Sequence, residues 1–202
     1  MLKNILLFLA LLNVYDLHAQ IVNCKMTGAF ESPTQYKYAY LCIPRDSTVI
    51  VAKIEDGKFV LSVPAPKDIE IGFLTLDFDS TKTYKNLMLV KVSERNLRPK
   101  MMAIENAHIA ISQSFSDSKV SGGADNKQVE DLENSIKTKD FKGFLNRYSD
   151  SKLAITLLRT FAALKKIIPG YDDSDPRVLY NMLSERLKKS KEGIKVFNEL
   201  NL

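Results

Sequence analysis

Two alternating apolar runs meet at a two-residue turn in the stretch Thr48-Val49-Ile50-Val51-Ala52-Lys53-Ile54-Glu55-Asp56-Gly57-Lys58-Phe59-Val60-Leu61-Ser62-Val63. An Asp-Gly pair favours a type I′ turn, whose twist suits a β-hairpin. The register that sets Glu55 against Lys58 makes one face of the hairpin wholly apolar. The residues opposed on that face are Ile54 with Phe59, Ala52 with Leu61 and Ile50 with Val63. We therefore predict a hairpin over residues 48–63, ended by the prolines at 64 and 66.

The sequence around this hairpin, from Ile21 to about Val120, is typical of β-structure, because apolar residues alternate and turn residues recur. Further strands are predicted at 22–30, 36–43, 69–78, 84–92, 101–105 and 108–112. The first two flank Ser32-Pro33-Thr34 and are expected to form a hairpin, and the last two meet at a tight turn of Asn106 and Ala107. About eight antiparallel strands would make a sandwich or a partly rolled sheet.

From about Gly122 to Leu202 the apolar spacing is near 3.6 residues, which indicates helices. We predict helices from Asp125 or Asn126 to about 139, from 151 to 168, from the Asp175-Pro176 start onward, and a short last helix with Ile194, Phe197 and Leu200. Ser121-Gly122-Gly123-Ala124 is interpreted as the junction between the two zones. The predicted fold class is α+β, with an antiparallel β-sandwich-like domain over 21–121 and a small C-terminal helical segment over 122–202.

The first residues differ from the rest of the chain. Residues 1–20 begin with a lysine at position 3, continue with a short apolar run at 5–12, and reach a small residue at Ala19. This layout is typical of a signal peptide cleaved after Ala19 or Gln20, and the run is too short to span a membrane. We expect export to the periplasm or outer envelope. An N-terminal core helix is the alternative, and a lipid anchor at Cys24 is disfavoured because Asn23 precedes it.

The composition excludes several classes of protein and of site. The 202 residues carry a net charge of +5, with 45% hydrophobic residues, 2 Cys and 2 His, so a disordered chain, a disulfide-dense scaffold and a cysteine zinc cluster are excluded. There is no C-x-x-C pair, nucleophile elbow or phosphate loop. We therefore predict no catalytic, cofactor-binding or metal-binding residue, no cofactor and no nucleic-acid partner. His108 is expected to face solvent beside a turn.

Two groups of residues remain as candidates. Cys24 and Cys42 would lie close together if the first two strands paired, which leaves a cross-strand disulfide, two buried free thiols or a redox pair as alternatives. Tyr36, Tyr38 and Tyr40 would share one face of a strand. Such a row could bind a sugar or a peptide, or could pack against helices.

The order of these parts resembles a domain of unknown function found at the N-terminus of secreted thiol–disulfide oxidoreductases and peroxiredoxin-like proteins of Bacteroides-type bacteria. The residues that carry the resemblance are 24–28 (Cys-Lys-Met-Thr-Gly), 38–41 (Tyr-Ala-Tyr-Leu), 54–59 (Ile-Glu-Asp-Gly-Lys-Phe), 102–109 (Met-Ala-Ile-Glu-Asn-Ala-His-Ile) and 120–126 (Val-Ser-Gly-Gly-Ala-Asp-Asn). In the helical part the similar segments are 148–151 (Tyr-Ser-Asp-Ser), 183–190 (Leu-Ser-Glu-Arg-Leu-Lys-Lys-Ser) and Gly193.

In that family a thioredoxin-like domain with a C-x-x-C site follows, whereas this sequence ends at Leu202, about where that domain would begin. The resemblance therefore carries over no catalytic residue. It implies an exported, non-catalytic accessory module that positions a thioredoxin-fold partner, pairs with a second copy of itself or binds an envelope component. A sugar- or peptide-binding protein that uses the tyrosine face is the alternative, and a redox protein that uses Cys24 and Cys42 is the second alternative.

Overall fold

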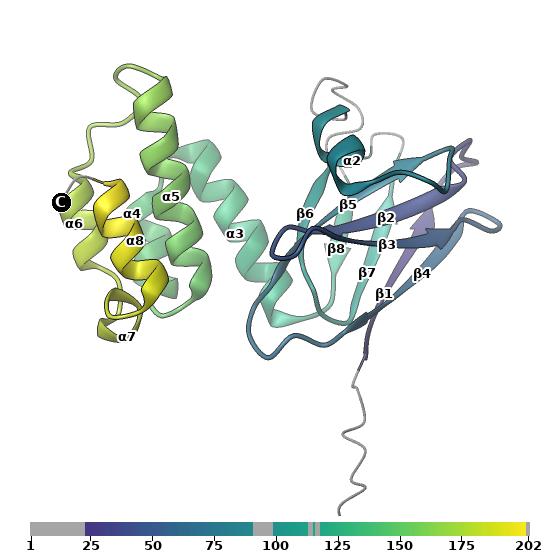
Figure 1. The fold of residues 1–202 in the computed structure, drawn as a ribbon, viewed down its shortest axis with the longest axis horizontal. Coiled ribbons are helices and arrows are strands. Elements are labelled where there is room, and N and C mark those ends of the chain that lie inside the picture. Colours follow the sequence, from purple (N-terminus) through teal and green to yellow (C-terminus); the bar gives the residue numbers. More distant parts are fainter. Residues whose placement is uncertain (1–22, 91–98, 113–114, 116–117, 201–202) are drawn as a thin grey trace, which may run out of the picture.

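The computed structural model describes residues 23–90, 99–112, 115 and 118–200, so the predicted signal peptide lies outside the described residues. Figure 1 shows a β-sandwich with a group of helices at one side. The strands are β1 (Asn23–Phe30), β2 (Tyr38–Ile43), β3 (Thr48–Lys53), β4 (Lys58–Pro64), β5 (Ile71–Asp77), β6 (Lys100–Ala103), β7 (Ala107–Ile111) and β8 (Lys119–Ser121). The helices are α2 (Tyr84–Val90), α3 (Ala124–Thr138), α4 (Phe141–Tyr148), α5 (Lys152–Ile167), α6 (Pro176–Asn181), α7 (Glu185–Lys188) and α8 (Lys191–Glu199).

The strands form two four-stranded sheets, in the orders β4-β1-β7-β8 and β3-β2-β5-β6. All pairs of neighbouring strands are antiparallel except β1 and β7. The inner faces of both sheets bury one apolar core, which includes Met26, Leu41, Leu61, Leu74 and Ile109. The α+β class predicted from the sequence is therefore confirmed, as a mostly antiparallel sandwich followed by C-terminal helices.

The central hairpin is correct at its turn and wrong beyond it. Asp56 and Gly57 both have positive φ, at 49° and 69°, as a type I′ turn requires, and Glu55 bridges Lys58. The two strands then diverge, because β3 pairs with β2 in one sheet whereas β4 pairs with β1 in the other. The apolar residues predicted to face each other within one sheet instead meet across the sandwich, in its common core.

The other two predicted hairpins are also wrong. Residues 22–30 and 36–43 form β1 and β2, which belong to different sheets, and β6 and β7 are likewise divided between the sheets. Residues 84–92 were expected to form a strand, but Tyr84–Val90 form helix α2. Its Leu87 packs on Tyr40 and Cys42, on the face of sheet β3-β2-β5-β6 that points away from the core.

The helical part has its own core around α5. Phe161 and Phe141 meet edge to face at 5.1 Å between ring centroids and lie in a cluster with Leu132, Leu157 and Leu179. The predicted cap Asp175 is present, because its side chain accepts from the amide of Arg177 beside Pro176. Ser151, predicted as the first residue of its helix, is instead the N-cap and accepts from the amide of Leu153. Helix α3 begins one residue before the expected caps, directly after Gly123, which has a φ of 78°.

Helix α3 joins the helical part to the sandwich. The side chain of Asn126 is buried and accepts a hydrogen bond from the amide of Ala103 at 2.9 Å, and donates to the Ala103 carbonyl at 3.3 Å and to Glu105 at 2.8 Å. It therefore occupies the free edge of β6 much as a neighbouring strand would. Ile69, Ile71 and Met101 of the sandwich also pack against the helical core.

Candidate functional site

The three tyrosines of the predicted ligand face do not lie together on one surface in the structure. Tyr40 is 1% exposed under α2, and its hydroxyl donates to the carbonyl of Asp79, while Tyr38 packs beside it. Tyr36 precedes β2, and its ring lies 5.1 Å from that of Phe78. Tyr40 therefore packs against a helix, the alternative that the sequence left open, and of the three residues Tyr36 alone lines a described hollow.

The two cysteines are free and buried. Cys24 lies on β1 and Cys42 on β2, so the strand pairing on which a disulfide was predicted does not form. Burial raises the pKa of the Cys24 thiol, and burial raises that of Cys42 to about 11. Because the thiolate is the reactive form, this arrangement does not favour a redox pair.

The raised pKa of Cys42 predicts a dependence of stability on pH. A thiol with a pKa of 9.0 when unfolded and about 11 when folded stabilises the fold fully below pH 9, and this contribution is lost as pH rises through 11. Between pH 7 and pH 10 the expected loss is about 1.4 kcal/mol. Urea unfolding at both pH values, for the parent chain and for Cys42→Ala, isolates this contribution from that of the other titrating groups. An equal loss in both proteins would contradict it.

Where several strands end, two adjoining hollows form a groove at one end of the sandwich. Their volumes are about 460 and 670 Å³, and both are lined by Phe30, Tyr36 and the segment Ser32–Gln35. Leu76, Ile111 and Phe115 line the first hollow, and Ile54, Asp56 and Gly57 line the second. We call this feature the open-end groove. It joins residues from β1, β5, β7 and the β3–β4 turn, which are far apart in the sequence.

The backbone of the segment Ser32–Gln35 crosses this groove without pairing to either sheet. It is flanked on one side by the Glu31 amide, which donates to Ile111 at 2.9 Å, and on the other by the Lys37 amide, which donates to Asp77 at 3.0 Å. Between them, the hydroxyl of Thr34 accepts from the amide of Tyr36, but the main-chain groups of Ser32–Gln35 bond to none of the described residues. The groove thus presents main-chain donors and acceptors next to aromatic rings.

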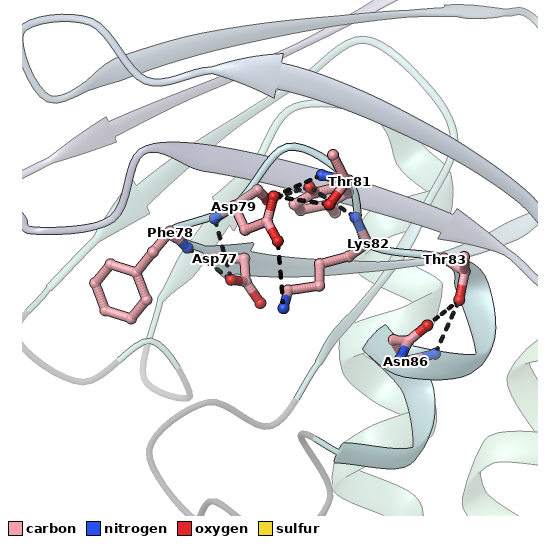
Figure 2. Close-up of polar contacts among 8 residues, drawn as sticks. Asp77, Phe78, Asp79, Thr81, Lys82, Thr83 and Asn86 are labelled. Atoms are coloured by element: carbon pink, nitrogen blue, oxygen red, sulfur yellow. Dashed lines mark hydrogen bonds and ion pairs between the residues drawn. The ribbon is translucent and has the colours of Figure 1, made fainter.

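Figure 2 shows the hydrogen bonds of the β5–α2 turn, which carries Phe78, the residue whose ring packs on Tyr36. The carboxylate of Asp77 accepts from the amides of Phe78 and Asp79, at 2.7 and 3.3 Å. The carboxylate of Asp79 accepts from the amide and hydroxyl of Thr81 and pairs with Lys82 at 3.6 Å. These contacts, of which the Thr81 hydrogen bonds count most, lower the pKa of Asp79. The main chain at Phe78 is consequently held in place, although the residue is 49% exposed.

The described part of the chain offers few other groups for catalysis or metal binding. His108 is exposed on β7, as expected, and its Nδ1 lies 2.9 Å from the Thr27 hydroxyl. Across residues 23–90, 99–112 and 118–200 no group of three or more His, Cys, Asp or Glu side chains could hold a metal ion. Within the same ranges no helix has the length and apolar character needed to cross a bilayer.

Comparison with known proteins gives no relative: no family model, curated protein or solved structure matches this chain. The open-end groove is therefore the site on which a functional interpretation rests. Sequence reasoning selected Tyr36 but missed Phe30 and Phe115, which line the groove, and Phe78, whose ring packs on Tyr36. No sequence pattern marks these three, because segments far apart in the sequence bring them together.

Proposed function

We propose that this chain is a non-catalytic binding module that holds an extended segment of a partner protein in the open-end groove. The observation that carries the proposal is that the segment Ser32–Gln35, whose main-chain groups bond to none of the described residues, lines the groove together with the half-buried rings of Phe30 and Tyr36. An extended peptide satisfies such main-chain groups with its own amides, and its side chains fill the hollows between the rings. A sugar also stacks on aromatic rings, but it does not require the row of main-chain groups.

The rings of Tyr36 and Phe78 are the expected anchors. They lie 5.1 Å apart at an interplanar angle of 34°, and Phe78 keeps about half of its surface exposed. Because the β5–α2 turn holds the main chain of Phe78 and its ring already packs on Tyr36, binding has less of this side chain to order. Aromatic residues that are rigid before binding are typical of interface hot spots.

The nature of the partner rests on the family resemblance. That resemblance supports a thioredoxin-fold protein of the cell envelope as the partner, and together with the pattern of residues 1–20 it supports export. Size-exclusion chromatography with light scattering tests the alternative of a second copy of this chain. A dimer that dissociates on Phe78→Ala would place a copy of the chain in the groove and overturn the thioredoxin-fold partner.

The test is a selection of random displayed peptides on the whole chain, followed by calorimetry with the selected peptide. We expect Phe78→Ala to weaken binding at least about tenfold, because it removes the exposed ring that packs on Tyr36, a residue that lines both hollows. Val60→Ala is the matched control, since Val60 is 57% exposed on β4 and is an apolar surface residue outside the groove lining. Equal affinity of the two variants would contradict the proposal. Failure to enrich peptides, together with binding on a glycan array that requires Phe78, would favour the sugar-binding alternative.

A further inference from the structure

A second cavity, of about 270 Å³, lies where α3 crosses the free edges of β6 and β8. Its lining includes Met101 of β6, Ser118 just before β8, and Val129 of α3. The volume lies just below the roughly 300–1,000 Å³ of pockets that take drug-sized molecules, so it suits a ligand between an amino acid and a short peptide in size. It is separate from the open-end groove.

The register of β6 turns main-chain groups toward this cavity. The amide of Ile104 donates to the carbonyl of Glu70 at 2.9 Å, and β5 pairs Ile71 with Ala103. In an antiparallel pair, alternate residues bond to the partner strand and the others point to the free edge. Ala103 bonds Asn126 at that edge, so the N–H and C=O of Met101, two residues earlier, point to the same edge beside the cavity.

Ser118 gives independent evidence that this cavity takes a polar ligand. Ser118 is 5% exposed, and its buried hydroxyl has no hydrogen-bond partner among the described residues. A buried polar group without a partner is costly and uncommon in native proteins. A polar ligand in the cavity that Ser118 lines would satisfy it.

The charges around the cavity balance. Lys100 and Glu133 form an ion pair at 3.2 Å, with their side chains 19% and 27% exposed, and Lys119 and Glu130 add one charge of each sign. A ligand with only a positive charge would be repelled by the two lysines, and a ligand with only a negative charge by the two glutamates. A ligand with one charge of each sign meets a complementary group at each end.

We propose that this cavity binds a short unblocked peptide of about dipeptide size. The carbonyl of the ligand's amide accepts from the amide of Met101, and the N–H of the ligand's amide donates to the hydroxyl of Ser118. Its carboxylate approaches Lys100, and its ammonium group approaches the Glu130 and Glu133 carboxylates. This inference does not depend on the proposed function of the open-end groove.

The test is an NMR titration of the whole chain with L-alanyl-L-alanine, followed at the amides of Met101 and Val120. We expect saturable shifts at millimolar concentration, and weaker binding both of L-alanine, which lacks the amide, and of the dipeptide blocked at both ends. Ser118→Ala should lower the affinity roughly twofold to tenfold without lowering the stability, because it removes a hydroxyl that has no partner in the free protein. Lys100→Met should abolish binding, whereas Lys142→Met, at an exposed position on α4, should not.

Absence of saturable shifts would mean that the cavity holds water only and would overturn the proposal. Equal binding of the blocked dipeptide would overturn the role of the charges, and equal binding of L-alanine would overturn the role of Met101. Unchanged affinity in Ser118→Ala would contradict the site itself. If Lys100→Met fails to fold, Glu133→Gln gives the same test of charge recognition from α3.

Discussion

Replacing Asn126 with alanine is expected to lower the free energy of unfolding by about 3 kcal/mol. The substitution removes the hydrogen bonds to both main-chain groups of Ala103, at 2.9 and 3.3 Å, and the one to Glu105 at 2.8 Å. It leaves the donor and the acceptor of Ala103, a fully buried residue, without their partner. The cost of an unsatisfied buried polar group exceeds the net contribution of an ordinary hydrogen bond, so we expect a large effect.

Urea denaturation measures this effect, and Asn134→Ala is the control. Asn134 lies on the same helix but is exposed, so its substitution changes helix propensity and little else. We expect the free energy of unfolding of Asn126→Ala to be clearly lower than that of Asn134→Ala. A midpoint of denaturation for Asn126→Ala equal to that of Asn134→Ala would mean that α3 does not depend on this contact with β6.

The second large effect is expected at Gly193, where α7 and α8 cross. A Cβ atom added there would lie 1.9 Å from the carbonyl oxygen of Leu187 and 3.1 Å from the Cα of Lys188. Both are backbone atoms, so no side-chain rotation relieves the clash, and the turn between the helices must open. We expect Gly193→Ala to destabilise the protein by about 3 kcal/mol, at the upper end for overpacking.

Helix propensity alone predicts the opposite sign for this substitution, because alanine is favoured over glycine within a helix by up to about 1 kcal/mol. Thermal or urea denaturation therefore separates the two effects by direction. Asn198→Ala, at an exposed position of the same helix, gives the size of the propensity effect without the clash. A stabilised Gly193→Ala would show that the chain does not cross so closely at this point.

The structural features that were predicted correctly from the sequence depend on local residue patterns. The Asp56-Gly57 turn and the Asp175 cap depend on neighbouring residues, and both are present. The strand partners of β3 and β4 are not local, because an apolar face can be buried equally well within one sheet or across two. The predicted apolar face was right, but the alternation of residues could not say which sheet each strand joins.

The candidate groove could be predicted only in part for the same reason. Tyr36 stood out because tyrosines alternate along one short segment. Phe78 is separated from it in the sequence by the four strands β2 to β5, and it reaches the ring of Tyr36 only because β2 and β5 are paired. Helix α2 was predicted as a strand, since seven residues with an apolar stripe do not distinguish the two structures.

The central claim is that the open-end groove binds an extended peptide, and hydrogen exchange of the full chain, with and without a selected peptide, tests it most directly. The account predicts that exchange slows at the amides of Ser32, Thr34 and Gln35, which bond to none of the described residues in the free protein. Exchange at the outer surfaces of α6 and α8 should stay unchanged. Protection confined to those helices, with none at Ser32–Gln35, would contradict the claim.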